Sequence, residues 1–225
     1  MSLRALHAEI VACTLCPRLR AHCADIAAVK RAAYRDESYW ALPLPGFGDP
    51  AARLLVVGLA PGAHGANRTG RMFTGDRSGL FLMTAMHDAG FASIPRSESR
   101  RDGLALRDAW ITAAVRCAPP DNKPTPQEFE TCLPFLEREW AALPRVQVVV
   151  ALGRLAWDVT WRVLADRGQG LRPRPSFGHG ATVAAPQNGP RVIGAFHPSQ
   201  QNTFTGRLTP EMLSRVFHEA RAALS

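Results

Sequence analysis

The sequence predicts an α/β protein whose largely parallel sheet is covered by helices on both faces. Four short apolar segments have the composition of buried strands, at residues 54–57, 109–115, 146–152 and 192–196. Helical segments lie between them, and strands that alternate with helices are typical of a parallel sheet. A chain of 225 residues, 46% of them hydrophobic, is long enough for one well-buried domain. We therefore expect a single domain over residues 1–225.

The first part of the chain combines a helical segment with an irregular one. Residues 2–30 are predicted to be helical and carry Cys13, Cys16 and Cys23, whereas residues 31–52 contain several prolines and glycines and are predicted to be irregular. Residues 58–79 follow the first strand and contain six glycines. We predict neither helix nor strand there, because glycine at this density lets the backbone approach a ligand closely.

A helix and a loop separate the first two strands. Residues 78–88 are apolar and predict a helix, which Gly90 terminates as the residue after the C-cap. Residues 92–108 are polar and rich in arginine, so an exposed loop is expected. The second strand leads into R-C-A-P-P-D-N-K-P at residues 116–124, whose prolines predict irregular structure.

The second half of the chain has clear helix start signals. The tetrapeptide T-P-Q-E at residues 125–128 combines an N-cap residue, a proline in the first helical position and the glutamate of a capping box. That helix is predicted to run to about residue 143. A further helix follows Gly153, and Thr209-Pro210 begins a closing helix after the fourth strand.

Three polar loops follow strand candidates, at residues 58–79, 116–125 and 197–208. The carboxyl ends of parallel strands meet at one edge of a sheet, and open α/β sheets bind their ligands there. We therefore expect these loops to form a single active site.

The charge of the chain suggests a polyanionic partner. Lysine and arginine number 27 against 19 aspartate and glutamate, which gives a net charge of +8, and Lys30 and Lys123 are the only lysines. Two interpretations stay open: nucleic acid binding, or a general compositional bias toward arginine. No run of 18 apolar residues predicts a membrane helix, and no signal peptide is recognisable. We expect a cytoplasmic protein without disulfides.

Four of the five cysteines are spaced as metal ligands. Cys13 and Cys16 form a C-x2-C pair, and Cys117 and Cys132 lie on either side of the predicted helix start. Four thiolates suit a [4Fe–4S] cluster or Zn²⁺, and the spacing does not choose between them. The alternative is buried cysteine without a ligand. Cys23 has no partner in this pattern and is expected to pack in the core.

Three ordered motifs resemble a known family. They are G-L-A-P-G-A-H-G-A-N-R-T-G-R-M-F-T-G-D at residues 58–76, C-A-P-P-D-N-K-P at 117–124 and H-P-S-Q-Q-N-T-F-T-G-R at 197–207. Together with the cysteine pattern, they are similar to the iron–sulfur uracil-DNA glycosylases of bacteria and archaea. The similarity is closer to family 5, also called type b, than to family 4.

This resemblance implies a fold, a cofactor and a reaction. The expected fold is a three-layer α/β/α sandwich around a four-stranded, largely parallel sheet, with a [4Fe–4S] cluster on the four cysteines. The expected reaction is base flipping and monofunctional hydrolysis of the N-glycosidic bond. Family 4 has an acidic residue where this chain has Leu59 and a uracil-reading asparagine where it has Ala113. Family 5 resembles the chain at both positions, and its substrates include uracil, hypoxanthine and xanthine.

Three side chains are candidates for the chemistry. Phe73 offers an aromatic face on which a flipped base could stack. His197 could donate a hydrogen bond to the departing base, which becomes anionic. Asp76 could position the attacking water or offset positive charge on the sugar. The alternatives are a core phenylalanine, a structural histidine and a helix N-terminal carboxylate; His64, His87 and His179 are weaker candidates.

Other positions are assigned supporting roles. The resemblance suggests that Asn122 assists Asp76 in positioning water, although Asn122 could equally be a turn residue. Backbone N–H groups of Leu59 and Ala60 could bind base carbonyls. The segment after His197 would fill the space left by the flipped nucleotide, and it includes Gln200, Gln201, Asn202 and Phe204. Arg68, Arg71 and Arg207 are candidate phosphate contacts.

We therefore expect a monomeric DNA repair glycosylase that removes uracil and other deaminated bases and leaves an abasic site. Two alternatives remain: a narrow, uracil-specific enzyme of the family 4 kind, and a non-catalytic, metal-containing DNA-binding protein. No lysine lies in the site motifs except Lys123, so lyase activity is not expected.

Overall fold

Four parallel strands form the centre of the sheet, as predicted. A computed structural model describes residues 2–224. It contains a six-stranded sheet in the order β1-β3-β2-β4-β6-β5. The central parallel strands are β2 (Leu54–Gly58), β3 (Ala109–Ala113), β4 (Val148–Leu152) and β6 (Arg191–Ala195). They are almost wholly buried, which explains why they read as continuous apolar runs.

The register of these strands places their carboxyl ends at one edge. Gly58 at the end of β2 is opposite Ala113 at the end of β3, and Leu152 of β4 is opposite Ala195 of β6. The loops that leave these four residues therefore begin at the same level of the sheet. This register confirms that the predicted loops at residues 58–79, 116–125 and 197–208 follow strands that end at the same edge of the sheet.

Two short antiparallel strands extend the sheet beyond the four that the sequence predicts. β1 (Phe47–Gly48) pairs with β3, and β5 (Thr182–Ala184) pairs with β6. Both are too short to carry a period-two pattern, and β1 lies in the proline- and glycine-rich segment that was expected to be irregular. Only pairing with a neighbouring strand defines them.

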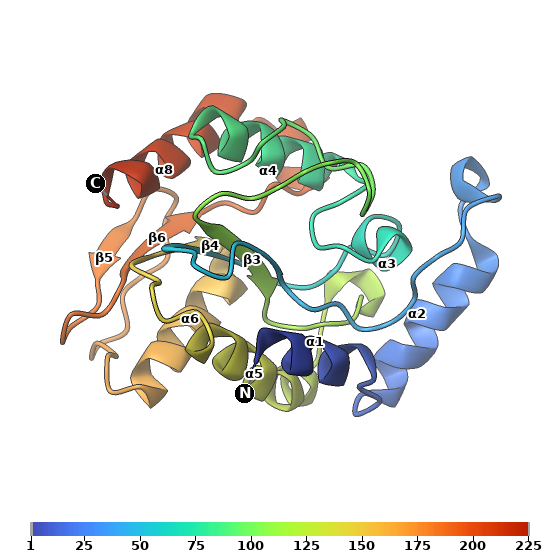
Figure 1. The fold of residues 1–225 in the computed structure, drawn as a ribbon, viewed down its shortest axis with the longest axis horizontal. Helices are drawn as coiled ribbons and strands as arrows, with labels where there is room; N and C mark the ends of the chain where they lie inside the picture. The colour runs from blue at the N-terminus through green and yellow to red at the C-terminus, as the bar shows by residue number, and fades with distance from the viewer. Residues whose placement is uncertain (1, 225) are drawn as a thin grey trace.

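Helices cover both faces of the sheet and complete the α/β/α sandwich (Figure 1). One face is covered by α4 (Arg77–Asp88) and α8 (Pro210–Ala222), drawn above the sheet in green and red. The other face is covered by α5 (Pro126–Ala141) and α6 (Arg154–Asp166), with α1 (Leu3–Val11) packed beside α5. The helix α2 (Pro17–Val29) lies at the side of the molecule where the cysteines gather.

The predicted helix starts are confirmed by their caps. The Thr125 side chain accepts a hydrogen bond from the backbone N–H of Glu128, whose own side chain accepts one from the N–H of Thr125. Thr209 is the N-cap residue of α8, and its hydroxyl accepts a hydrogen bond from the N–H of Met212. Gly90 follows α4 with φ +76°, the left-handed conformation expected after a helix.

Several short helices were not predicted. The glycine-rich segment contains α3 (Ala66–Thr69), so the expectation of no helix there was wrong. Further single turns are η1 (Ala32–Tyr34), η2 (Pro120–Asn122) and α7 (Gln200–Phe204). These elements have three to five residues, too few for a hydrophobic period to reveal them.

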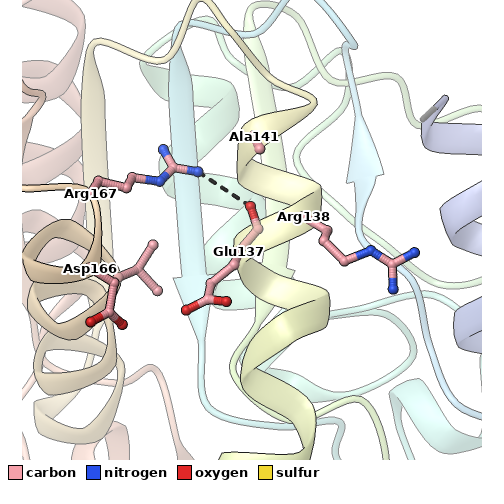
Figure 2. Close-up of a pocket in the computed structure, with 6 residues that line it drawn as sticks. Glu137, Arg138, Ala141, Asp166 and Arg167 are labelled. Carbon is pink, nitrogen blue, oxygen red and sulfur yellow. Dashed lines mark hydrogen bonds between the residues drawn. The ribbon is translucent and has the colours of Figure 1, made fainter.

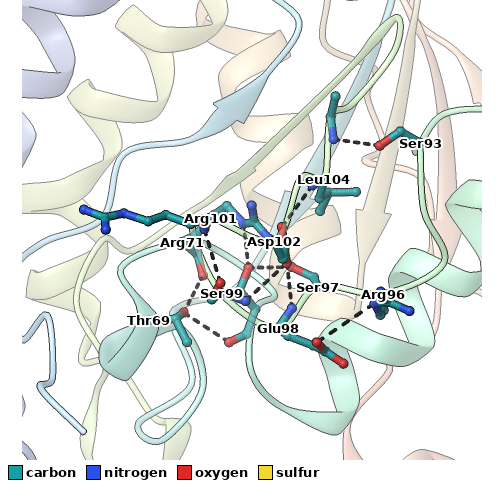
Figure 3. Close-up of polar contacts among 12 residues, drawn as sticks. Thr69, Arg71, Ser93, Arg96, Ser97, Glu98, Ser99, Arg101, Asp102 and Leu104 are labelled. Carbon is teal, nitrogen blue, oxygen red and sulfur yellow. Dashed lines mark hydrogen bonds and ion pairs between the residues drawn. The ribbon is translucent and has the colours of Figure 1, made fainter.

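The arginine-rich loop at residues 92–108 is more ordered than an exposed loop. An isolated bridge between Ala92 and Leu106 closes it. Inside the loop, the Asp102 carboxylate accepts hydrogen bonds from the backbone N–H groups of Glu98 and Ser99 and pairs with Arg71 (Figure 3). The loop therefore supports the glycine-rich segment that contains Arg71.

None of the helices within residues 2–224 has the length and apolar character that crossing a membrane requires.

Candidate active site

The candidate site lies where β2 and β6 end. The rings of Phe73 and His197 come from loops 124 residues apart, and their centroids are 5.9 Å apart with the planes inclined by 35°. The structure therefore brings together the two side chains expected to hold the flipped base and its developing charge. The parallel register at the carboxyl edge is what allows this contact.

Phe73 is held over the end of β2 by glycines. A Cβ atom on Gly58 would lie 2.9 Å from the ring carbon Cε2 of Phe73, so only glycine permits this close packing. Phe73 has φ +48°, an unusual conformation for a bulky residue. Its carbonyl lies against Gly79, where an added Cβ would approach to 2.2 Å. Such a conformation persists only where its surroundings enforce it, and it is typical of functional positions.

His197 is half-buried at the end of β6, and burial lowers the pKa of its imidazole to about 4. The ring is therefore neutral at pH 7, as the assigned role requires. The Asn202 side-chain amide donates a hydrogen bond of 2.8 Å to the His197 carbonyl. Asn202 thus braces the histidine backbone, a contact that the sequence did not reveal.

Asp76 has two distinct environments for its two carboxylate oxygens. Oδ1 accepts a 2.8 Å hydrogen bond from the N–H of Gly79 and caps α4. Oδ2 faces the preceding loop, where a Cβ on Gly65 would lie 2.0 Å from it and one on Gly62 3.0 Å from it. Burial raises the pKa of the carboxyl, although the N–H groups of Gly79 and Ser78 and the charge of Arg68 oppose this shift. The helix-capping alternative is correct for one oxygen, while the other faces the glycine loop.

The remaining predicted site residues occupy different settings. Leu59 and Ala60 are half-buried at the end of β2; the Leu59 carbonyl accepts a hydrogen bond from the N–H of Val115. Asn122 is exposed on η2 with φ +56°. Among residues 2–224, the Asn122 side chain makes no hydrogen bond to Asp76 or His197. Its role in positioning water stays a prediction.

The segment after His197 forms α7, with Ser199 as its N-cap. Gln200 and Gln201 are exposed, and Phe204 is exposed to 62%. The guanidinium of Arg77, the first residue of α4, lies 4.5 Å from the centroid of the Phe204 ring. The side chains expected to fill the space of a flipped nucleotide are therefore accessible, apart from Asn202, whose amide is used internally.

Two of the three predicted phosphate contacts must be corrected. Arg68 is only 7% exposed and pairs with Glu37, and the Arg71 side chain pairs with Asp102 at 2.7 Å. Arg68 directs Nε, Nη1 and Nη2 at protein oxygens, and Arg71 directs Nε and Nη2 at protein oxygens, so both side chains are held within the protein. Arg207 is exposed above the Phe196 ring, and its predicted phosphate contact remains. The sequence could not predict that Arg68 and Arg71 are held within the protein, because an arginine in a polar loop is usually exposed.

The four cysteines of the proposed ligand set meet between α1, α2, β3 and α5. Cys117 and Cys132 are buried in one hydrophobic cluster, and Cys13 and Cys16 pack against it. Burial, followed by the proximity of the other three thiols, raises the pKa of Cys16 to about 11. Within the described residues, no three His, Cys, Asp or Glu side chains are arranged as a preformed metal-binding group.

Two further residues pack in or against this cysteine cluster, Cys23 and Ala60. Cys23 is buried, and its thiol donates to the Ala118 carbonyl at 3.6 Å, which confirms its packing role. Ala60 packs against the same cluster from the site side. The candidate active site and the cysteines are thus linked by one turn of backbone after β2.

Two cavities lie away from these residues. One, of about 350 Å³, lies between α5 and α6 and is lined by Glu137, Arg138, Ala141, Val163, Asp166 and Arg167 (Figure 2). There, Arg167 donates a 3.3 Å hydrogen bond to the Glu137 carbonyl. The second, of about 460 Å³, adjoins α1 and β1. Neither is lined by Asp76, Phe73 or His197, so the candidate site is identified by its converging side chains.

Comparisons with known proteins agree with this geometry. Residues 45–221 match the family model described as the uracil DNA glycosylase superfamily. The chain is 51% identical over 221 residues to a type-5 uracil-DNA glycosylase of Mycobacterium tuberculosis, covering 98% of this chain and 81% of the relative. It is 50% identical to a type-5 enzyme of Thermus thermophilus, covering 98% of each chain. A type-4 enzyme of Archaeoglobus fulgidus is 38% identical over only 50% of this chain and 49% of its own length. The chain therefore belongs to the uracil-DNA glycosylase superfamily and, within it, to the type-5 branch.

Proposed function

We propose that the protein removes hypoxanthine and xanthine as well as uracil from DNA and leaves an abasic site. Its family membership makes it a monofunctional uracil-DNA glycosylase that acts on DNA. The removal of hypoxanthine and xanthine goes beyond what family membership shows. It is supported by Ala113, which ends β3 beside Gly58 and carries no polar group that could select the uracil edge.

Base capture in this proposal depends on stacking and backbone contacts. The Phe73 ring offers an apolar face, and base–aromatic stacking contributes about 1–3 kcal/mol with little discrimination between bases. Leu59 and Ala60 follow β2 next to this ring and would present backbone N–H groups to base carbonyls. A site that reads bases in this way accepts uracil and deaminated purines alike, because both carry carbonyl oxygens.

His197 would stabilise the departing base. Bond cleavage leaves negative charge on the base, and a hydrogen-bond donor aimed at that charge lowers the barrier. With its pKa lowered to about 4 by burial, the imidazole is neutral at pH 7 and would donate the hydrogen bond through its single ring N–H. The Asn202 amide holds the His197 carbonyl and so limits movement of the ring.

Asp76 would serve the sugar side of the reaction. Its Oδ2 packs against the glycines at 62 and 65, where the Cβ of any other residue would collide with it. In the overall reaction, the hydroxyl of water is added to C1′ and the base leaves with its electron pair and then takes up a proton. Asp76 would orient that water and accept its proton. Asn122 is proposed as its assistant.

The substrate proposal is tested with matched oligonucleotides that carry uracil, hypoxanthine or xanthine, followed by alkaline cleavage at abasic sites. Release of uracil and at least one purine is expected. Release of uracil alone would overturn the broad specificity and favour the narrow enzyme. Asp76→Asn serves as the inactive control, because asparagine also caps helices and the variant should fold.

We further propose that Cys13, Cys16, Cys117 and Cys132 hold a [4Fe–4S] cluster. A single ion requires all thiolates about 2.3 Å from one centre, whereas each thiolate of a four-iron cluster binds a different iron. The four cysteines lie in and against one buried cluster, so they could supply the four thiolates that a four-iron cluster needs. When bound, it would fasten the α1–α2 segment to α5. Iron and sulfide analysis with broad visible absorption supports this proposal; stoichiometric zinc in a colourless protein contradicts it.

A further inference from the structure

Arg68 has little contact with solvent and several contacts with the loops of the candidate site. It belongs to α3, inside the glycine-rich segment, and is 7% exposed. Its guanidinium lies over the Tyr34 ring, 3.9 Å from the centroid, and pairs with Glu37. A buried arginine with this many partners is positioned by the fold and cannot reach a DNA phosphate.

The same guanidinium connects the two loops that flank Asp76. Its Nη2 donates a 2.7 Å hydrogen bond to the carbonyl of Gly75, the residue before Asp76. Its Nε donates a 2.8 Å hydrogen bond to the His64 carbonyl. His64 precedes Gly65, the glycine that Oδ2 of Asp76 faces. One rigid fork therefore determines how far the carboxylate lies from the opposite loop.

The segment at residues 34–41 holds this arrangement from outside. The N–H of Trp40 donates to the Arg68 carbonyl at 2.9 Å, and the N–H of Ala41 donates to that of Asn67 at 3.0 Å. The Tyr39 hydroxyl and Nδ1 of His64 are 2.9 Å apart. These contacts explain why an exposed, irregular segment stays attached to α3: it supplies both the ring beneath Arg68 and the carboxylate beside it.

We propose that Arg68 positions Asp76 for the reaction by tying together the two loops that flank this carboxylate. This inference rests on the proposed role of Asp76. It also has an electrostatic consequence, because Arg68 is the charged side chain that favours the ionised form of Asp76, while burial raises its pKa. The other groups that favour ionisation are the backbone N–H groups of Gly79 and Ser78 on α4.

The test compares Arg68→Met with Arg68→Lys in steady-state assays on uracil-containing DNA. Each variant is expected to lower kcat about 10²-fold, because displacement of a catalytic group by about 1 Å has that effect. KM should change little, since the guanidinium does not contact DNA. The acidic limb of the kcat–pH profile should move to higher pH in the methionine variant only, because lysine keeps the positive charge that lowers the pKa of Asp76.

Arg53→Met is the matched control for loss of an ion-paired arginine. Arg53 pairs with Asp108 at 2.6 Å and precedes β2, at the opposite edge of the sheet from Asp76. Its substitution should leave the acidic limb in place. If Arg68→Met raises KM alone, or retains the kcat of the unaltered protein, Arg68 does not position Asp76.

A double substitution separates this inference from the role of Asp76 itself. In an Asp76→Asn background, Arg68→Met should cause no additional loss of kcat, because the residue acts through Asp76. An additional 10²-fold loss would overturn the inference, whereas full activity of Asp76→Asn alone would overturn the role of Asp76. If Arg68→Met does not fold, Glu37→Gln provides the same comparison with an expected loss below about fivefold.

Discussion

Two carboxylates withdrawn from solvent, Glu139 and Asp76, have opposite electrostatic settings. Glu139 of α5 is fully buried and pairs with Arg116 at 2.9 Å. It also accepts hydrogen bonds from the Thr112 hydroxyl and, at 2.9 Å, from the N–H of Gly46. Burial opposes ionisation, yet the charge of Arg116 and hydrogen bonds from His7, Thr112 and Arg116 lower the pKa of Glu139 to about 2.

Asp76 is less completely compensated. Its Oδ1 is occupied by the helix cap, Oδ2 faces glycines, and burial outweighs its hydrogen bonds and raises its pKa. The comparison shows that burial alone does not identify a functional carboxylate. A carboxylate with donors on both oxygens stabilises the fold, whereas one with fewer donors and a pKa raised by burial is suited to accept a proton.

Loss of the Glu139 carboxylate is expected to have the largest effect on stability. Glu139→Ala should lower the free energy of unfolding by about 3–5 kcal/mol, because it leaves the Arg116 charge buried without its partner. Urea denaturation measures this change. Glu130 lies on α5 as Glu139 does, and it pairs at the surface with Arg162 of α6. Glu130→Ala should therefore lower the free energy of unfolding much less. Similar losses of unfolding free energy in Glu139→Ala and Glu130→Ala would show that the buried pair is worth no more than the surface pair.

The same carboxylate should also contribute to acid unfolding. Its pKa in the folded protein is about 2, below the value of 4.5 for an unperturbed glutamate. The unfolded chain therefore binds this proton first, and the contribution to stability is complete above about pH 4.5 and lost as the pH falls toward 2. Glu139→Gln should flatten the dependence of the unfolding free energy on pH in that range. An unchanged slope would show that the pair does not govern it.

Asp76→Asn should reverse this pattern of effects. Asparagine keeps the helix cap but cannot accept a proton, so kcat on uracil-containing DNA should fall about 10²–10³-fold. The melting temperature should stay close to that of the unaltered protein. A large loss of stability with little loss of kcat would mean that Asp76 resembles Glu139 and serves the fold.

The pH profile offers a sharper form of the same test. Because the pKa of His197 is about 4, its imidazole stays neutral above that pH, and the fall of kcat on the acidic side should follow the protonation of Asp76. The acidic limb should be absent from the residual activity of Asp76→Asn. Its persistence would assign the limb to another group.

Phe73→Ala should have a smaller effect, because it removes only the stacking surface for the base. The expected fall in kcat/KM corresponds to a loss of about 1–3 kcal/mol of transition-state stabilisation. Loss of the ring also relieves its close approach to Gly58. The effect should be similar for uracil and hypoxanthine, since stacking discriminates little between bases. Unchanged kcat/KM would remove Phe73 from the site.

The smallest expected effect concerns DNA binding. Arg207→Gln should lower by about one the slope of log K against log salt, because it removes one exposed phosphate contact. Arg71→Gln should leave that slope unchanged and lower stability, because Arg71 is paired internally with Asp102. Equal slopes for the two variants would contradict the distinction drawn from their exposure.

Local patterns in the sequence were sufficient for much of the fold. Buried parallel strands are apolar along their whole length, so β2 and β4 could be located directly, and the capping box at residues 125–128 placed the start of α5. The short edge strand β1 and the single turn α3 could not be predicted, since each depends on partners distant in the sequence. The motifs indicated which residues belong to the site, but their individual environments had to come from packing.

By itself, the sequence determined the α/β class, the family and the residues that gather at the carboxyl edge of the sheet, because these depend on local periodicity and motif order. The tertiary structure alone decided that Arg68 and Arg71 face inward, that Asn202 braces His197, and that Asp76 divides its two oxygens between a helix cap and the glycine loop. Burial and hydrogen-bond geometry arise from segments far apart in the chain. The protonation state and availability of a side chain depend on those contacts, and therefore follow only from the folded arrangement.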